Sequence, residues 1–296
     1  MSQTTERIQK LHKLPFTHVD VFSRTPLSGN GLIVFPSARG LSSSQMQRLT
    51  QEMRQFESIF LTRKRGQTYG ARIFTMQEEV AFAGHPSLGA AATLHHHKEN
   101  AATREEWVLD LPAKSVQIIT EKRDYGYEAT MNQGEPHFGK PISTRRANTF
   151  VKAFNLSADD LADLPLQVVS TGLPYLILPI KRGIERARIV QPTVGKLLQR
   201  VGANYAYLLD VERREARSWE NDGSLEDVAT GSAAGPAGAY LVRHGLADVE
   251  DTLTIRQGRF LGRESELRVR IYGTTTLLTS VHVAGDVVII AEGKLL

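Results

Sequence analysis

Apolar and polar residues alternate in short runs near the start of the chain, a pattern that predicts strands separated by tight turns. The first clear run covers residues 16–22, and a turn at Gly29-Asn30-Gly31 leads into a second apolar run that ends at Phe35. Serines then precede apolar residues at helical spacing, which predicts a helix with a serine N-cap. Its apolar positions are Met46, Leu49 and Met53. Another strand is predicted at residues 56–61.

The second half of the chain repeats the first at an offset of 147 residues. The turn Gly84-His85-Pro86 falls on Gly231-Ser232-Ala233, and four following residues recur, with Ala90, Ala92, Leu94 and His97 matching Ala237, Ala239, Leu241 and His244. Residues 71–74 resemble residues 216–219 at an offset of 145, which predicts a loop two residues longer in the second half. Chance recurrence of small-residue helices is the alternative, but a frame shared by separate anchors favours duplication.

This repeat predicts an α+β protein of two pseudo-symmetric halves. Each half is expected to form a curved, mostly antiparallel sheet or barrel around a small-residue central helix, at residues 89–97 and 236–244. The first domain is placed at residues 15–132 and the second at 133–279. The last strand, about residues 280–296, is a candidate to return to the first domain. Residues 1–14 are polar and mixed in charge, which predicts a flexible tail.

Composition narrows the class of protein. No apolar run approaches the ~20 residues of a membrane-spanning helix, so no membrane association is expected. The first residues carry no apolar signal core, so a cytoplasmic location is expected. The chain has no cysteine, which excludes disulfides, thiolate nucleophiles and thiolate metal ligands.

The net charge of +4 is spread along the chain, which gives little support to a nucleic-acid partner. A mixed solvated surface and attraction of a small anionic substrate both remain open. Neither a phosphate-binding loop nor a dinucleotide fingerprint is present, so no nucleotide cofactor is expected. The run His95-His96-His97 cannot hold one metal ion from one helix face and is interpreted as surface residues at a helix end. No metal and no other cofactor is expected.

Both repeated glycine turns enter a helix, whose N-terminal N–H groups favour an anion such as a carboxylate. If the halves face each other about a pseudo-dyad, both helix ends point into one cleft, the usual place for a small-molecule site.

Three side chains could carry acid–base chemistry, each with a plainer alternative. Glu57 opens a strand on the face of Ile59 and Leu61, where desolvation would raise its pKa, although an exposed helix-end glutamate would look the same. Asp227 is either functional or only a cap for the following turn. His85 stands at a helix entrance and titrates in a useful range.

Several motifs together resemble the PhzF-like family of phenazine biosynthesis proteins. They are Gly29-Asn30, Phe56-Glu57-Ser58, Phe82-Ala83-Gly84-His85-Pro86-Ser87-Leu88-Gly89, Ser170-Thr171-Gly172, Glu226-Asp227-Val228-Ala229-Thr230-Gly231-Ser232-Ala233-Ala234-Gly235 and Gln257-Gly258-Arg259. The resemblance implies the diaminopimelate epimerase-like fold, with the active site between the two halves. Two-thiol epimerisation is excluded because the chain has no cysteine.

The resemblance also implies roles for particular residues. Glu57 matches a proton-shuttling glutamate, and His85 and Asp227 match residues that assist it. Substrate binding is implied for the matched residues Asn30, Ser58, Gly84, Thr230, Gly231 and Ser232. The family's named activity isomerises trans-2,3-dihydro-3-hydroxyanthranilate by moving a proton between ring carbons. Phe56, Ser58 and Val228 depart from the usual family pattern, which leaves the substrate open.

The leading hypothesis is therefore a cofactor-independent isomerase acting on a small cyclic or unsaturated carboxylate. The alternative is a non-catalytic small-molecule-binding protein that keeps the same cleft. A homodimer is also open, since symmetric dimers are common among soluble proteins.

Overall fold

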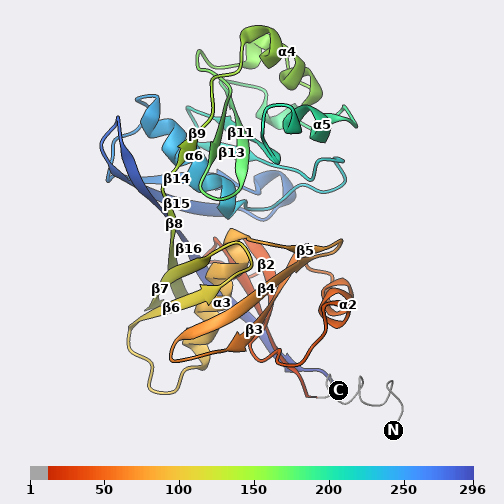
Figure 1. Ribbon diagram of the computed structural model, residues 1–296, viewed down its shortest axis with the longest axis vertical. Coiled ribbons are helices and arrows are strands. Elements are labelled where there is room, and N and C mark those ends of the chain that lie inside the picture. Colours follow the sequence, from red (N-terminus) through yellow and green to blue (C-terminus); the bar gives the residue numbers. More distant parts are fainter. Residues whose placement is uncertain (1–12) are drawn as a thin grey trace. The chain divides into compact units, whose positions relative to one another are not determined.

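The computed structural model describes residues 13–296, which divide into two compact units (Figure 1). The described part of the first unit is residues 13–131 together with Ala284–Leu296, and the second unit is Asn132–Val283. The sequence placed the end of the first domain at residue 132 and the start of the returning strand at about residue 280. These positions lie one residue and about four residues from the unit boundaries of the structure. Each unit is described below by itself.

The expected N-terminal tail, residues 1–14, lies outside the described residues except for its last two. Lys13 N donates a hydrogen bond to Leu295 O (2.8 Å), and Leu295 N donates to Leu14 O (3.0 Å). Leu14 is buried. These two residues therefore belong to the pairing between the two ends of the chain.

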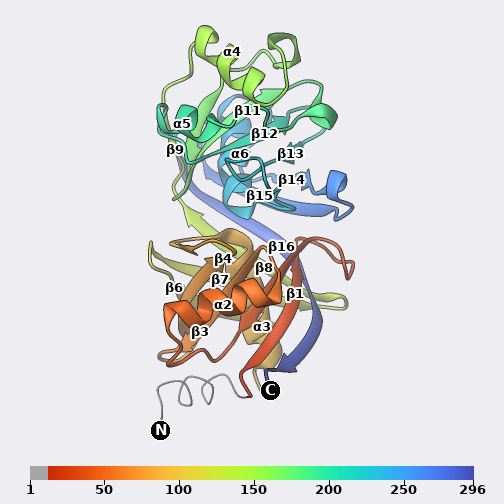
Figure 2. The ribbon, with the colours of Figure 1, turned by 90° about the vertical axis from the view of Figure 1, so that its right-hand side faces the viewer.

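The first unit is a sheet closed around one helix. Its strands are β1 (Pro15–Val21), β2 (Asn30–Phe35), β3 (Glu57–Arg63), β4 (Thr68–Thr75), β5 (Glu79–Val80), β6 (Arg104–Asp110), β7 (Ser115–Arg123), most of β8 (Gly126–Gly134) and the C-terminal part of β16 (Leu278–Lys294). The order is β1-β2-β3-β4-β6-β7-β8-β16, and β16 also pairs with β1, so the sheet closes. The helix α3 (Gly84–His97) packs against β1, β2, β3, β6 and β7 (Figure 2).

A second helix, α2 (Ser43–Met53), packs on β3 and β4 on the other side of the sheet. Ser42 caps it in a capping box with Gln45, as the serine pattern predicted. A cluster of buried residues fills the space between α2 and the sheet, namely Leu14, Ile33, Phe35, Ala38, Leu41, Met46, Leu49, Phe60 and Phe74. The two faces of β2 and β3 therefore have different partners, α3 on one face and α2 on the other.

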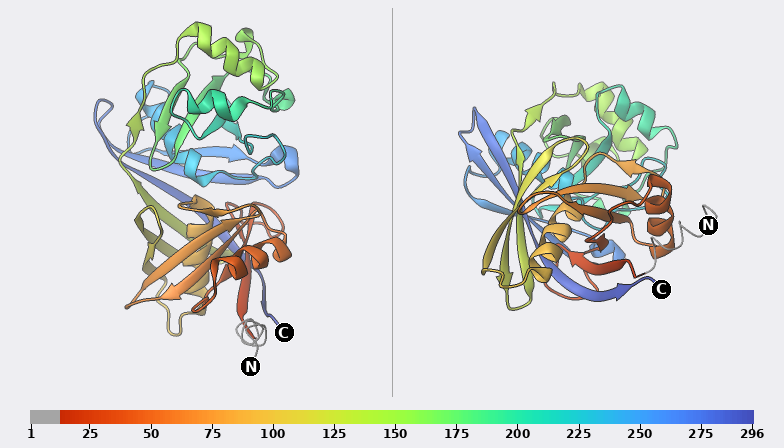
Figure 3. Two further views of the ribbon diagram at one scale, coloured as in Figure 1. Left: turned by 45° about the vertical axis from the view of Figure 1, so that its right-hand side comes forward. Right: turned by 60° about the horizontal axis from the view of Figure 1, so that its bottom comes forward.

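The second unit has the same plan with additional helices (Figure 3). Its strands are β9 (His137–Phe138), β10 (Gln167–Ser170), β11 (Pro174–Ile180), β12 (Tyr205–Asp210), β13 (Glu215–Arg217), β14 (Thr252–Gln257), β15 (Ser265–Gly273) and the start of β16. The central helix α6 (Gly231–Arg243) packs against β10, β11, β12 and β15. The remaining helices are α4 (Thr144–Ala153), α5 (Val194–Gln199) and the 3-10 turns η1 (Ala158–Asp160), η2 (Ile184–Arg186) and η3 (Arg259–Leu261).

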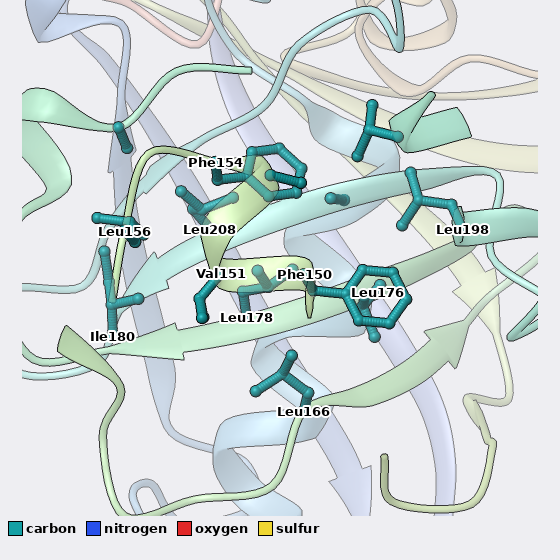
Figure 4. Close-up of a cluster of buried hydrophobic side chains, with 14 of the residues drawn as sticks. Phe150, Val151, Phe154, Leu156, Leu166, Leu176, Leu178, Ile180, Leu198 and Leu208 are labelled. Carbon is teal, nitrogen blue, oxygen red and sulfur yellow. The ribbon is translucent and has the colours of Figure 1, made fainter. Parts of the chain in front are cut away.

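The additional helices of the second unit cover a large apolar cluster. Figure 4 shows Phe150 and Val151 of α4, and Phe154 directly after it, against the strand side chains Leu176, Leu178, Ile180 and Leu208. Phe154 also packs against the ring of Trp219, with the centroids 6.1 Å apart. This layer stabilises the outer face of β11 and β12 and leaves their other face to α6.

The two units share one sequence of strand pairings. In the first unit, β1–β2, β2–β3, β3–β4, β4–β6 and β6–β7 are antiparallel, parallel, antiparallel, parallel and antiparallel. In the second unit, β10–β11, β11–β12, β12–β13, β13–β14 and β14–β15 follow the same series. The central helices begin at Gly84 and Gly231, 147 residues apart. The predicted fold class of two pseudo-symmetric α+β halves is confirmed.

The strand register corrects one detail of the repeat. Leu61 pairs with Ala71, whereas Leu208, its counterpart at 147 residues, pairs with Arg217. The counterpart of Ala71 is thus Arg217. The offset between the two halves in this segment is therefore 146 residues, not the predicted 145. The loop before the second glycine turn is one residue longer, not two, because side-chain alternation ties the register to one face of the sheet.

The interpretation of the histidine run was wrong for its first member. His95 is buried, and its ring lies 2.8 Å from Thr120 Oγ1 and 2.9 Å from Ala102 O. His96 and His97 are exposed. One turn at the end of α3 therefore has both a sheet-facing and a solvent-facing side, which the position at a helix end did not reveal.

Candidate active site

The candidate site residues of the first unit lie where three of its elements begin. Asn30 opens β2, Glu57 opens β3 and Gly84 opens α3. Leu32 and Glu57 are register partners, so the alternation of side chains places Asn30 and Glu57 on one face. This is the face toward α3, because a side chain at Gly89 of α3 would meet Leu32.

His85, the second residue of α3, joins Asn30 and Glu57. Its Nδ1 lies 3.3 Å from Glu57 Oε2 and 3.4 Å from Asn30 Nδ2. The three residues are only 5%, 3% and 2% exposed for Glu57, His85 and Asn30. A carboxylate, an imidazole and a carboxamide from distant parts of the chain therefore form one buried polar cluster.

Burial keeps the imidazole of His85 neutral. Desolvation lowers the pKa of His85 from 6.5 to about 3. The neutral ring has one N–H, and the contact with the Glu57 carboxylate places it on Nδ1, whereas donation from Asn30 Nδ2 would place it on Nε2. Nε2 is buried and has no hydrogen-bond partner among residues 13–296. The neutral ring therefore contacts Glu57 and Asn30 through Nδ1, while its Nε2 is left for a further partner.

Ser58 does not join this cluster through its hydroxyl. It aligns in register with Ile33 and Phe74, and both belong to the apolar cluster beneath α2. Successive strand residues point to opposite faces, so Ser58 Oγ lies on the side away from Glu57. The hydroxyl is buried and has no hydrogen-bond partner in the described part of the chain.

The candidate site residues of the second unit lie at the start of α6. Asp227 Oδ2 accepts a hydrogen bond from Thr230 Oγ1 (2.7 Å), and its Oδ1 accepts one from Ala229 N (3.3 Å). Asp227 therefore has the turn-capping contacts that the sequence left open as its plainer role. These contacts fix the loop that leads into Gly231 and Ser232, so the structure brings the four predicted residues of this unit together.

Ser232 occupies the repeat position of His85. Its Oγ lies 2.7 Å from the hydroxyl of Tyr175, and both side chains are buried. Sequence reasoning missed Tyr175, because it stands in an apolar strand where an aromatic residue is expected as core. It also assigned no role to Gln257 or Gln133, which hydrogen-bond to Thr230 N (3.1 Å) and to Gly231 O (2.9 Å).

Neither helix start has a side-chain cap. The residues before α3 and α6, Ala83 and Thr230, make no capping hydrogen bond to the first turn. The first-turn N–H groups of both helices are therefore not satisfied by an N-cap side chain, an arrangement that favours a small anion. Within residues 13–296, no group of three His, Asp or Glu side chains is arranged to hold a metal ion. None of the helices described has the length and apolar character needed to cross a lipid bilayer.

Two α+β units, each built around a helix that starts at a glycine turn, define a racemase- and epimerase-like class of fold. A solved probable proline racemase from Agrobacterium radiobacter shares it, with a TM-score of 0.65, 14% identity, and coverage of 95% of this chain and 92% of that chain. The family model described as phenazine biosynthesis-like protein (PhzC-PhzF) matches residues 19–293. The chain belongs to this family.

Two relatives are more similar. The solved structure of a protein from Pseudomonas aeruginosa described as a predicted epimerase is 46% identical, with a TM-score of 0.90, and covers 95% of this chain and 99% of that chain. The trans-2,3-dihydro-3-hydroxyanthranilate isomerase of Pseudomonas chlororaphis is 29% identical over 94% of this chain and 97% of its own length. The expectation of one site shared by both halves stays a prediction.

Proposed function

We propose that this protein is a cofactor-independent isomerase that moves a proton within a small cyclic or unsaturated carboxylate, with Glu57 as the general acid/base. The observation that carries the proposal is the buried contact of Glu57 with neutral His85 at the start of α3. Burial of a carboxylate is costly for folding, although an adjacent helix N-terminus offsets part of that cost, and such groups concentrate at functional sites.

The chemistry needs one base that becomes an acid. Glu57 takes a proton from one carbon of the substrate, the electron pair shifts along the unsaturated framework, and the protonated carboxyl returns the proton to another carbon on the same face. No net electron or proton is gained or lost. In the first unit, the N–H groups of Gly84 and its first helical turn are proposed to bind a substrate carboxylate, with Asn30 as a polar contact. In the second unit, Gly231 and Ser232 at the start of α6 are proposed as substrate-binding residues.

His85 and Asp227 have supporting roles in this proposal. Because His85 is neutral at physiological pH, it can hydrogen-bond Glu57 in both protonation states without fixing it as an ion pair. Asp227 is proposed to assist proton movement and to fix the first turn of α6 through Thr230. Ser58 is proposed to contribute to binding through its backbone only, since its hydroxyl faces the α2 side of the sheet.

The test is proton NMR in deuterated buffer. Trans-2,3-dihydro-3-hydroxyanthranilate is the first substrate to try, because the Pseudomonas chlororaphis relative is named for its isomerisation. We expect product with deuterium at carbon, and loss of at least 100-fold in kcat for Glu57→Gln, a typical size for one general acid/base. The matched control is Glu105→Gln, which removes another buried carboxylate of the same unit, one held by Lys98 (2.6 Å).

The outcomes separate the hypotheses. Equal turnover in Glu57→Gln and the wild type would remove Glu57 from the mechanism. Binding of the compound, or of other small carboxylates, without deuterium incorporation would support a non-catalytic binding protein. Turnover of a different unsaturated carboxylate with deuterium incorporation would keep the mechanism and change only the substrate.

A further inference from the structure

The side-chain amide of Gln257 lies next to the loop that leads into α6, and all of its hydrogen-bonding groups have partners. Gln257 ends β14 and is only 1% exposed. Its Nε2 donates to Asp227 O (2.8 Å) and to Thr230 Oγ1 (3.0 Å). Its Oε1 accepts from Thr230 N (3.1 Å) and from Tyr207 Oη (3.0 Å). All four hydrogen-bonding positions of the amide are used.

Two backbone groups fix the orientation of this amide. Thr230 N can only donate, so it must face the oxygen, and the carbonyl of Asp227 can only accept, so it must face the nitrogen. The amide cannot flip without losing both bonds. The Thr230 hydroxyl therefore meets an N–H of Gln257 and must accept from it.

The direction of the next hydrogen bond follows from this one. Because Thr230 Oγ1 accepts from Gln257, its own proton is free to go to Asp227 Oδ2, 2.7 Å away. The other end of the chain of bonds is fixed as well, since burial and then the charge of Asp227 raise the pKa of Tyr207 and keep it a donor. The bonds therefore run in one direction, from Tyr207 through Gln257 and Thr230 to Asp227.

The residue after Gln257 holds the turn in place. Gly258 has φ +88°, and a Cβ there would lie 2.2 Å from Arg263 O and 2.8 Å from Val228 O. Only glycine fits this conformation and this close approach. The turn thus places the side-chain amide of Gln257 against the loop that contains Asp227.

We propose that Gln257 is a positioning residue that directs the Thr230 hydroxyl onto Asp227 and so holds this carboxylate as a charged acceptor. The inference rests on the proposed function insofar as Asp227 belongs to the proposed site. Gln257 acts through Thr230 and needs no contact with substrate.

The first measurement does not need a substrate. Carboxyl ¹³C NMR of aspartate-labelled protein follows the titration of Asp227, whose signal is assigned by its loss in Asp227→Asn. We expect Gln257→Leu and Thr230→Val each to raise the titration midpoint of Asp227 by about one pH unit, the size of one hydrogen bond to a charged group. Thr230→Ser keeps the hydroxyl and should restore the wild-type midpoint. In an active enzyme, the acidic limb of the kcat/KM profile should move by the same amount.

A matched control separates positioning from general destabilisation. Tyr240→Phe removes another buried hydroxyl bond of α6, to Pro165 O (2.8 Å), with no link to Thr230. It should leave the Asp227 midpoint unchanged. Other charged groups of the neighbouring segments keep their own partners in all of these variants, namely Glu226 with Arg217 and Arg259 with Glu215.

The inference is overturned if Gln257→Leu leaves the Asp227 midpoint in place while Thr230→Val raises it, or if Tyr240→Phe moves it equally. Should Gln257→Leu fail to fold, Gln257→Met, which keeps the length of the side chain and removes its amide, takes its place with the same expected rise and the same refuting outcome. Absence of isomerase activity in the wild type would count against the proposed function, while the NMR titration would still test the role of Gln257.

Discussion

The neutral state of His85 can be tested through the pH dependence of stability. The perturbation is His85→Gln, which keeps a polar side chain and removes the titrating ring. In the wild type, burial holds the pKa of His85 at about 3, against 6.5 for an exposed histidine. The unfolded chain therefore binds a proton at this position between these two pH values, and the folded chain does not.

The magnitude follows from this difference. The stability that depends on neutral His85 is complete above pH 6.5 and is lost as the pH falls toward 3. One pKa unit corresponds to about 1.4 kcal/mol, so lowering the pH to 5 should cost the wild type about 2 kcal/mol through His85 alone. The ring is 3% exposed, so solvent screening reduces this value little.

The assay is urea unfolding at pH 8 and pH 5 for the wild type and for His85→Gln. The loss of unfolding free energy on acidification should be smaller in the variant by about 2 kcal/mol. Titrating groups that do not contact His85, including buried His95, contribute equally to both proteins and cancel. His137→Gln, at an exposed histidine of β9, is the control and should follow the wild type.

The opposite sign would refute the reasoning. If Glu57, 3.3 Å away, held His85 as an imidazolium, the folded state would bind the proton more tightly than the unfolded chain. The wild type would then gain stability relative to His85→Gln as the pH fell through 6.5. That result would also remove neutral His85 from the proposed mechanism.

Three further substitutions test the packing around the site by urea or thermal unfolding. Gly89→Ala should destabilise the first unit by about 1–2 kcal/mol, because its Cβ would lie 2.6 Å from Leu32 Cδ2 and overpacking exceeds the gain in helix propensity; unchanged stability would contradict the close approach of α3. Arg217→Met should cost about 3 kcal/mol or more, because it leaves the Glu226 side chain, only 10% exposed, without its 2.6 Å partner, whereas a neutral outcome would mean that the pair adds nothing. Ser42→Ala should cost about 1 kcal/mol through loss of the capping box of α2, and an equal midpoint would show that the cap is dispensable.

Much of the fold could be predicted because its signals are local or repeated. The serine-capped helix at 43–53 and the strands that begin at Asn30 and Glu57 follow from short-range patterns. The helix starts at Gly84 and Gly231 follow from the repeat, although both helices begin five residues before the predicted helical stretch. Proline in the first turn of α3 obscured its start, yet proline is well tolerated there.

The site was predicted in part. Asn30, Glu57 and His85 were singled out by their motifs, and the structure gathers them within hydrogen-bonding distance. Ser58 was expected with them as a substrate-binding residue, but strand alternation turns its hydroxyl to the other face. Tyr175 was missed because it stands in an apolar strand, and Gln257 was quoted in a motif but given no role, because a sequence gives no sign of a buried hydrogen-bond network.

The sequence by itself determined the duplicated plan, the absence of thiol chemistry and the acid–base residue types. These depend on composition, periodicity and glycine turns, all of which act over a few residues of chain. Only the tertiary structure decided that His85 is buried and neutral and that the Gln257 amide meets the Thr230 hydroxyl. Burial and hydrogen-bond direction depend on groups tens of residues apart in sequence, so they are set only when the sheet and helix pack together.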